Sequence, residues 1–207
     1  GHELTHRKNS KLDMFIGNWL QALCWDNAFA IEHVYGHHKN VGLFKDAATA
    51  RRGENIYRFM IRSTIIEHKN AFEIEKKRLE KRKQSTFSFR NRYFIGFFRS
   101  IFITLVVYYC AGGIALSCYL LSAFISKILL ESINYIEHYG LVRVEGRPIR
   151  PRHSWNSNTF ISGALLFNLT RHSAHHEKTN LPFWELEPYS EAPNMPYGYL
   201  STFFIAL

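Results

Sequence analysis

Cysteine and proline are scarce in most of this chain, and their absence excludes several classes of protein. Only three cysteines occur, Cys24, Cys110 and Cys118, and no two of them stand in C-x-x-C spacing. Two of them lie in an apolar stretch, so we expect reduced thiols buried in protein or lipid and no disulfide framework. All six prolines fall between residues 148 and 196, which predicts a loop-rich tail. No secretory signal peptide, internal repeat or low-complexity tract is visible.

Basic residues outnumber acidic ones, and the excess occurs in an apolar, aromatic-rich chain. The net charge is +9, with 46% hydrophobic residues, 17 Phe, 11 Tyr and 4 Trp in 207 residues. This length suits one domain with a real core. Positive charge alone suggests nucleic acid or an anionic membrane surface, but the combination favours a membrane. A nucleic-acid-binding protein has no use for the apolar run and the histidine clusters described below, so we expect no nucleic acid partner.

Charge almost disappears between Tyr93 and Leu130, where Arg99 and Lys127 are the only charged residues. At about 1.5 Å per helical residue this stretch suffices for two short spans, with Gly112-Gly113 as the turn. We therefore predict a transmembrane hairpin at 93–130 in an all-α, integral-membrane helical bundle. The uncharged run 14–25 is too short for a bilayer that needs about 20 residues. We expect that run to be interfacial or folded back into the protein.

A strongly basic segment precedes the predicted hairpin. From Lys69 to Arg92 nine Lys or Arg and three Glu give a net charge of 9 − 3 = +6. Both signs of charge interleave with apolar residues over 67–84, which predicts a surface helix with either a solvated face or a binding role. A hairpin returns the chain to its starting side, so His138 and the basic segment share one membrane face. The positive-inside rule makes that face cytoplasmic.

Histidine is abundant, and nine of the eleven histidines fall into short motifs. They are His2 and His6 in HELTH, His33, His37 and His38 in EHVYGHH, His138 in NYIEHYGL, and His172, His175 and His176 in RHSAHH. Residues four apart on a helix share one face, so His2 with His6, His33 with His37, and His172 with its two partners are expected to share centres. A single pair at this spacing usually consists of ordinary surface or core histidines, but several such pairs in one short chain predict metal binding.

The number of histidines indicates more than one ion. Nine imidazoles exceed the four to six ligands that saturate a transition metal, whereas two ions would receive four or five each and keep positions open for O2 or water. Zinc prefers closed tetrahedral or three-ligand sites, which favours a pair of redox ions. Iron fits best and copper is the main competitor. The two other histidines are expected elsewhere, His68 in solvent and His153 in a loop.

The motifs HELTHRK, EHVYGHH, NYIEHYGL and RHSAHH resemble, in the same order, those of the integral-membrane alkane monooxygenases. The hydroxylase component of xylene monooxygenase is a close relative, and the wider superfamily includes membrane fatty-acid desaturases. NYIEHYGL is the most specific motif, because desaturases share the histidine clusters but lack it. The resemblance runs from Gly1 to the end, and the tail from Phe183 also looks somewhat like the aromatic-methyl branch.

This resemblance implies an alkane 1-monooxygenase, which hydroxylates a terminal methyl group to a primary alcohol with O2. It implies six spanning helices in a bacterial inner membrane, with two non-haem irons held by the nine histidines and the active site toward the cytoplasm. Electrons would come from a rubredoxin, or a ferredoxin-like donor in the xylene branch, through an NADH-dependent reductase. The partners would be membrane lipid, O2 and a hydrophobic substrate. Residues 1–207 are then expected to be a catalytic domain truncated at both ends.

Other functions remain open at this point. An aromatic-methyl (xylene) monooxygenase and a fatty-acid desaturase use the same type of site on other substrates. A metal transporter is a different class, but it needs ionisable ligands within its spans, where this sequence has only Arg99 and Lys127. Substrate chain length, the electron donor and the oligomeric state do not follow from the sequence.

Four polar residues are candidates to support the ligand histidines. Glu3, Glu32 and Glu137 each directly precede a histidine of a motif, and Asn134 lies one turn before His138. A carboxylate that accepts the second ring N–H of a ligand histidine fixes its tautomer and raises its basicity. Neighbouring helical residues diverge by about 100°, so each Glu is expected to support a histidine of another motif. The alternative is an exposed or helix-capping carboxylate.

Overall fold

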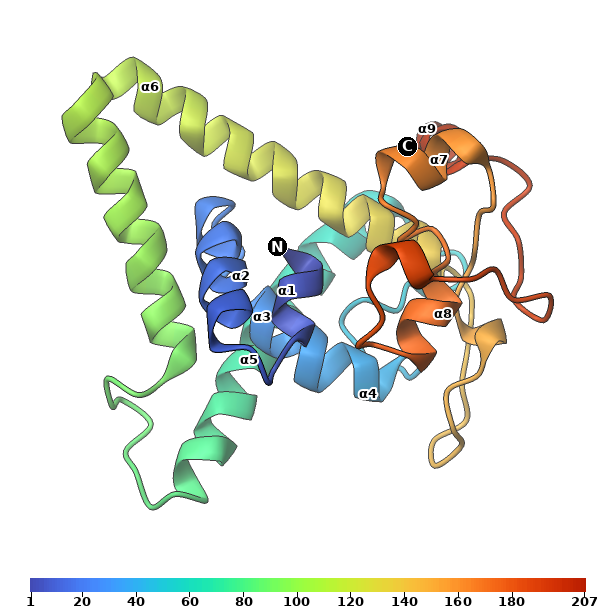
Figure 1. Cartoon of the computed structure of the whole chain (residues 1–207), viewed down its shortest axis with the longest axis horizontal. Coiled ribbons are helices and arrows are strands. Elements are labelled where there is room, and N and C mark those ends of the chain that lie inside the picture. Colours follow the sequence, from blue (N-terminus) through green and yellow to red (C-terminus); the bar gives the residue numbers. More distant parts are fainter. The chain divides into compact units, whose positions relative to one another are not determined.

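The computed structural model describes residues 1–207, and every regular element in it is helical (Figure 1). The one pairing of extended chain is an isolated bridge between Asn156 and Asn194. The predicted all-α class is therefore confirmed. The chain forms two compact units, of which the first comprises Gly1–Gly36 with Ile65–Leu129 and the second His37–Thr64 with Leu130–Leu207.

The first unit begins with short helices that pack closely. They are α1 (His2–His6), α2 (Lys11–Leu23), α3 (Phe29–Glu32) and the π-helical turn η1 (His33–His37), whose last residue belongs to the second unit. The hydroxyl of Ser10 caps α2 by accepting from the Asp13 amide at 3.2 Å. A Cβ on Gly17 would lie 3.0 Å from the Leu4 Cβ, so glycine lets α2 approach α1.

Helix α6 (Arg92–His138) is the one helix long and apolar enough to cross a membrane, and its apolar window is almost entirely exposed. Figure 1 shows it as two limbs that meet at a sharp bend. The bend is at Gly112, whose φ of 78° lies in the left-handed region that glycine adopts without strain. The bend falls at the Gly112-Gly113 pair where the sequence predicts the turn. That both limbs span the bilayer stays a prediction.

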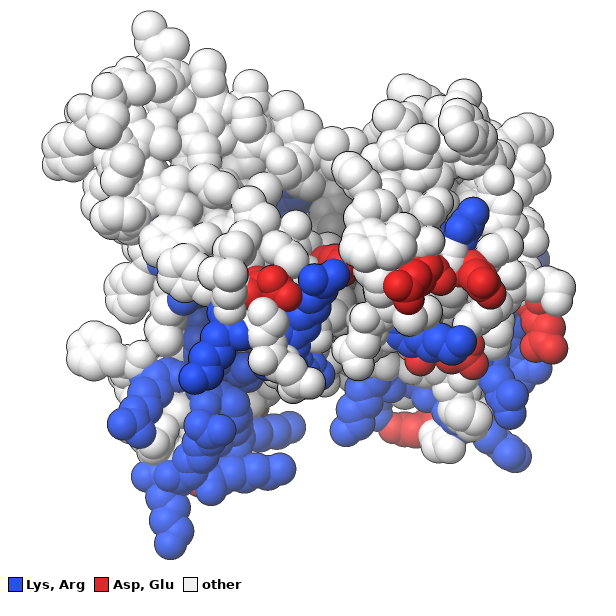
Figure 2. Space-filling model, in the orientation of Figure 1, with Lys and Arg blue, Asp and Glu red and all other residues white.

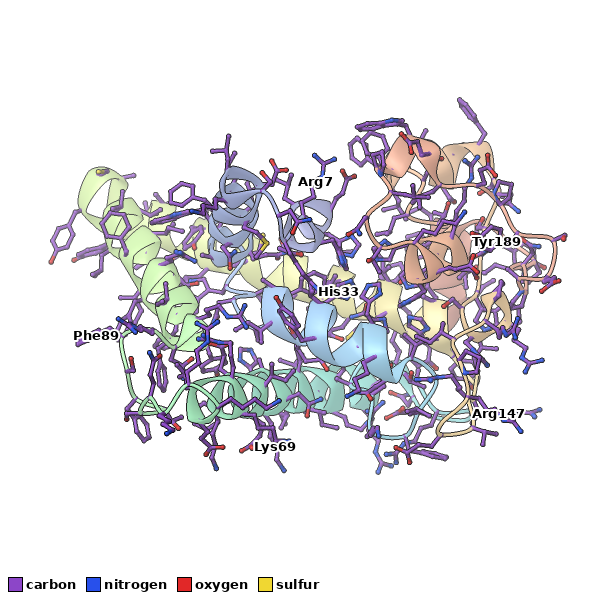
Figure 3. All side chains as sticks on the ribbon, turned by 60° about the horizontal axis from the view of Figure 1, so that its bottom comes forward. Arg7, His33, Lys69, Phe89, Arg147 and Tyr189 are labelled. Carbon is purple, nitrogen blue, oxygen red and sulfur yellow. The ribbon has the colours of Figure 1, made fainter.

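The basic segment of the first unit is the last part of α5 (Ile56–Glu80) and the loop that follows. Lys and Arg side chains gather over the end of α5 in Figure 2, and Lys69 projects away from the protein in Figure 3. One buried carboxylate anchors this segment, because Glu75 binds Arg78 at 2.6 Å and Arg92 at 2.5 Å. Burial alone would raise the pKa of Glu75, but hydrogen bonds from both arginines hold it below its ordinary value.

The second unit combines the start of α5 and the end of α6 with a mostly irregular tail. Its other elements are α4 (His38–Asn40), η2 (Pro151–His153), α7 (Phe160–Leu165), α8 (His172–Glu177), η3 (Phe183–Glu185) and α9 (Tyr199–Ala206). Phe59 and Tyr135 meet edge-to-face at 5.3 Å in its core, where Tyr199 is also buried. The Trp155 amide donates to the Glu137 carbonyl at 2.8 Å, which places the tail against the end of α6, next to His138.

Candidate metal centre

Four histidines of the second unit converge on one point. They are His37, His138, His172 and His176, hereafter the four-histidine cluster, and their ligand nitrogens all lie within 4.8 Å of one another. The Nε2 atoms are 3.3 Å apart between His37 and His176, 3.1 Å between His138 and His172, and 2.9 Å between His172 and His176. All four side chains are buried.

Local structure explains why these rings meet. His172 and His176 are four residues apart on α8, so they share a helix face, while His138 is the last residue of α6 and His37 ends η1. Burial and the neighbouring imidazoles lower the pKa of His176 well below its ordinary value. Two nitrogens bound at about 2.1 Å to one tetrahedral ion lie about 3.4 Å apart, close to the spacings seen here. Neutral, convergent imidazoles thus fit a transition-metal ion.

A buried aspartate that was not predicted from the sequence orients one histidine of this cluster. Both Asp46 carboxylate oxygens lie 3.0–3.1 Å from the His37 Nδ1, and the Thr49 hydroxyl donates to Asp46 at 2.6 Å. Burial would raise the pKa of Asp46, but His37 and Thr49 lower it below its ordinary value. The carboxylate therefore fixes the tautomer in which His37 presents Nε2 to the cluster. Asp46 follows His37 by nine residues, through the three-residue α4 and irregular chain, so no sequence periodicity pointed to it.

The support of His138 comes from a second histidine. The His153 carbonyl lies 3.3 Å from the His138 Nδ1, and the His153 ring accepts from the Arg150 amide at 3.0 Å. His153 is buried in the 3-10 turn η2 and lies outside the four-histidine cluster. Its contribution is a backbone acceptor, which the sequence cannot reveal.

Among the predicted supporting residues, Glu137 lies closest to the cluster. Its Oε2 is 3.2 Å from the Nε2 of His172, a histidine of another motif, and its Oε1 accepts from the Tyr199 hydroxyl at 3.0 Å. The contact is with Nε2, the nitrogen that faces the other imidazoles, and not with the distal N–H of a ligand histidine that the sequence predicts Glu137 to hold. Asn134 instead donates to Glu131 on its own helix at 3.4 Å.

The remaining two histidines of the second unit pair with each other. The Nε2 atoms of His38 and His175 are 3.1 Å apart, and the rings of His38 and His176 are 4.6 Å apart between centroids. Of the two histidines one turn after His172, His176 meets it within the cluster as predicted, while the Nε2 of His175 faces that of His38.

The first unit holds its own group, the three-histidine cluster of His2, His6 and His33. The Nε2 of His2 lies 2.8 Å from that of His33 and 3.4 Å from that of His6. The predicted His2–His6 pair lies on one face of α1, and the His33 ring stacks on Phe29 at 4.4 Å. The expectation that His33 and His37 share a centre is wrong, because residues 33–37 form a π turn and the two rings belong to different clusters.

The other candidates of the first unit occupy separate environments. Glu3 pairs with Arg7 at 2.5 Å at the surface of α1. Glu32 is buried and accepts from Asn70 at 3.2 Å. His68 is half-buried against Tyr93, whose hydroxyl is 3.1 Å from its Nδ1, so the expectation of a solvated side chain is wrong.

Comparisons with known proteins match the whole chain. A family model described as fatty acid desaturase matches residues 1–206. The chain is 36% identical over 211 residues to alkane 1-monooxygenase 1 of Pseudomonas aeruginosa and 34% identical over 212 residues to alkane 1-monooxygenase 2 of Alcanivorax borkumensis. Both alignments cover 100% of this chain and 55% of the relative.

A relative with a different printed substrate also matches. The chain is 33% identical over 195 residues to the xylene/toluene monooxygenase hydroxylase component XylM of Pseudomonas putida, with 94% of this chain and 53% of that protein covered. The chain therefore spans about half the length of the curated relatives it matches.

Proposed function

The chain belongs to the fatty acid desaturase family, and on this premise we propose that the complete protein is an alkane 1-monooxygenase. It converts R-CH3, O2, two electrons and two protons into R-CH2OH and water. The observation that carries the proposal is the buried four-histidine cluster in a chain similar over its whole length to alkane 1-monooxygenases. Two irons are held by the nine histidines of the motifs, and the four-histidine cluster holds one of these irons.

Iron bound at these residues supplies the activation of O2 that attack on an unactivated C–H bond requires. The chain's own residues hold and orient the ligands. Asp46 fixes the His37 ring through Nδ1, and the His153 carbonyl does the same for His138. Tyr199 donates to Glu137 and holds that carboxylate beside His172. Burial of the four rings keeps bulk water away from the centre.

The setting of the reaction follows from the same proposal. The enzyme lies in a bacterial inner membrane, which the two limbs of α6 enter as a hairpin, with its metal centre toward the cytoplasm. The substrate is a hydrocarbon with a terminal methyl group. Electrons come from a rubredoxin or ferredoxin-like donor and an NADH-dependent reductase. Hydroxylation of an aromatic methyl group is the second candidate, favoured by the similarity to XylM, and desaturation of a fatty-acyl chain is the third.

Product analysis of the complete gene, expressed with an electron-donor system, tests the proposal. Cells given octane should form octan-1-ol, whereas benzyl alcohol from toluene or a new double bond in acyl chains would instead support the second or third candidate. The purified full-length protein should contain about two irons per chain.

A matched pair of variants ties the activity to the cluster. His172→Ala should lose iron and activity together, because His172 contacts His138, His176 and Glu137. His68→Ala, which removes a histidine outside both clusters, should retain both. Full activity of His172→Ala, or hydroxylation without bound iron, would contradict the proposal.

A further inference from the structure

The second unit carries a surface without charged residues. Residues 154–170 and 192–207 contain no Lys, Arg, Asp or Glu, and we call them together the apolar cap. The Ser162 hydroxyl accepts from the Tyr199 amide at 3.0 Å, which joins α7 to α9. Phe160 is 88% exposed and Phe204 70% exposed, and the surface around α7 is free of charge in Figure 2. Helix α7, with six residues, is too short to span a bilayer, and its exposed apolar side chains suit the boundary between lipid and water.

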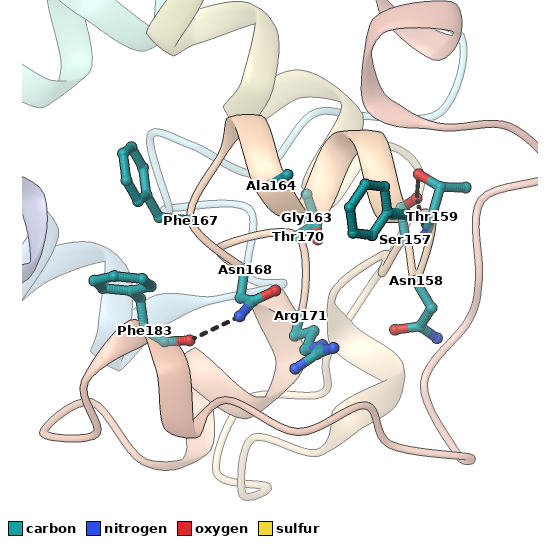
Figure 4. Close-up of a pocket in the computed structure, with 11 residues that line it drawn as sticks. Ser157, Asn158, Thr159, Gly163, Ala164, Phe167, Asn168, Thr170, Arg171 and Phe183 are labelled. Carbon is teal, nitrogen blue, oxygen red and sulfur yellow. Dashed lines mark hydrogen bonds between the residues drawn. The ribbon is translucent and has the colours of Figure 1, made fainter.

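A cavity of about 370 Å³ opens in this cap beside α7 (Figure 4). Phe167 and Phe183 lie on one side with their ring centroids 5.3 Å apart, and Phe160 also lines the cavity. The polar lining includes Asn158, Asn168 and Arg171. The cavity therefore joins apolar walls to a polar end, within the volume range of small-molecule sites. None of the nine motif histidines lines it, so it is separate from the metal centre.

Arg171 is the one charged residue in the lining, which includes no carboxylate. Its Nη1 donates to the Leu186 carbonyl at 2.5 Å, which holds the guanidinium in place. A guanidinium has five N–H donors, so donors remain for a ligand. Arginine binds carboxylate and phosphate oxygens through two parallel hydrogen bonds. A fixed guanidinium without an acidic neighbour indicates an anionic ligand.

The backbone of the cavity wall is strained where it meets this guanidinium. Phe167 and Asn168 are consecutive non-glycine residues with φ of 51° and 54°, a left-handed conformation that is rare for a phenylalanine. The side-chain amide of Asn168 donates to the Phe183 carbonyl at 3.3 Å, and its backbone N–H donates to the Gly163 carbonyl at 2.8 Å. Backbone strain that is held by such contacts is typical of binding sites. Here the strained conformation presents the Phe167 ring and the Asn168 amide next to each other in the cavity wall.

We propose that this cavity binds the anionic head group of an acyl-chain lipid. The head group pairs with Arg171, and the acyl chain leaves past Phe160 and Phe167 into the membrane. At about 30 Å³ per water-sized group, the cavity holds roughly a dozen such groups, enough for a head group and the first methylenes. The head group belongs to a free fatty-acid anion or to a phospholipid, which share this chemistry. The proposal rests on the membrane location given under the proposed function but not on iron or hydroxylation.

Equilibrium binding of radiolabelled dodecanoate to the purified full-length protein in neutral-detergent micelles tests the site. Dodecan-1-ol has the same chain without the charge and should compete at least about tenfold more weakly, because it lacks the charge-assisted hydrogen bonds. Phosphatidylglycerol is the other competitor. Stronger competition by it than by unlabelled dodecanoate assigns the site to phospholipid, and weaker competition assigns it to free fatty acid.

Three variants locate the binding. Arg171→Gln should weaken dodecanoate binding about tenfold to a hundredfold, whereas Arg147→Gln, which removes an exposed arginine of the same unit outside the cavity, should leave it unchanged. Ala164→Phe fills the cavity with Arg171 in place and should abolish binding without lowering the thermal unfolding temperature. This variant separates loss of the site from misfolding.

Two results would overturn the proposal. One is equal competition by dodecan-1-ol, which would mean that no head-group charge is recognised. The other is full dodecanoate binding by Ala164→Phe, or an equal loss in Arg171→Gln and Arg147→Gln, which would mean unspecific attraction to a basic protein. Because binding is measured without turnover, a protein that binds dodecanoate but does not hydroxylate octane would refute the proposed function alone.

Discussion

The two histidine clusters are built in different ways. In the three-histidine cluster, His2 and His6 come from one short helix, and His33 stacks on Phe29 one helical turn before it. The four-histidine cluster gathers residues from η1, α6 and α8, and its supporting contacts are made by Asp46, 9 residues from His37, and by His153, 15 residues from His138. One short helix thus supplies two of the three histidines in one cluster, whereas the other cluster draws on three separate elements. In the four-histidine cluster, buried hydrogen bonds hold His37 through Asp46 and His138 through the His153 carbonyl.

Removal of one of those hydrogen bonds is the strongest test of the contrast. Asp46→Asn keeps the shape of a buried side chain but removes the negative charge opposite the His37 Nδ1. Loss of such an outer partner typically lowers metal affinity or activity about tenfold to a hundredfold. Competition with an iron chelator should show this loss in the purified full-length protein.

The matched change in the other cluster is Glu3→Gln, since Glu3 pairs with Arg7 at the protein surface. It should leave iron affinity and activity within about twofold of the unmodified protein, as is usual for exposed ion pairs. Equal losses in the two variants would show that the clusters do not differ as described.

The next largest effect is expected on stability, from a change in the packing around the π turn at Gly36 in the first unit. A Cβ on Gly36 would lie 2.6 Å from the Glu32 Oε1, within a buried region, so Gly36→Ala displaces that carboxylate from Asn70. Overpacking of this kind costs about 1–3 kcal/mol. The thermal unfolding temperature should fall. Gly113→Ala is the control, because no atom lies within 4 Å of its added Cβ, and it should be neutral or slightly stabilising.

Features that repeat at a regular spacing, or that use an uncommon side chain, could be predicted from the sequence. Features that depend on tertiary contacts could not. The motif histidines stand out by type and spacing, and the bend of α6 falls at the predicted glycine pair. Asp46 and Tyr199 carry no local signal, since Asp46 meets His37 and Tyr199 meets Glu137 only after the chain has folded. The π turn was also invisible, because its hydrogen bonding and not its composition differs from an α-helix.

Each unit contains a buried carboxylate whose ionisation affects the stability of the protein at low pH. Glu75 of the first unit binds two arginines, and Glu54 of the second binds Arg62 at 2.6 Å. Hydrogen bonds from these arginines outweigh burial and lower the pKa of each carboxylate below its ordinary value. A lowered folded-state pKa means that the ionised form stabilises the protein above the unfolded pKa, and that this contribution is lost as pH falls through the folded pKa.

Thermal unfolding of the full-length protein between pH 7 and pH 3 measures this contribution. Glu75→Gln should lower the unfolding temperature at pH 7, and the difference from the unmodified protein should shrink toward pH 3. Glu54→Gln should show the same trend with a smaller difference, because it loses one arginine partner where Glu75 loses two. A difference that grows on acidification would contradict the assigned direction of the pKa shifts.

The smallest expected effect concerns a single hydroxyl in the second unit. Tyr199→Phe removes the hydrogen bond to Glu137 and keeps the buried ring in the core beside Tyr135 and Met195. The loss of one such bond is worth about 1 kcal/mol, with a few-fold decrease in iron affinity if Tyr199 positions the carboxylate beside His172. Tyr197→Phe, which removes an exposed hydroxyl from the same segment, should change neither quantity. If Tyr199→Phe lowered stability but left iron affinity unchanged, the hydroxyl would serve the core of the second unit and Glu137 would hold its position without it.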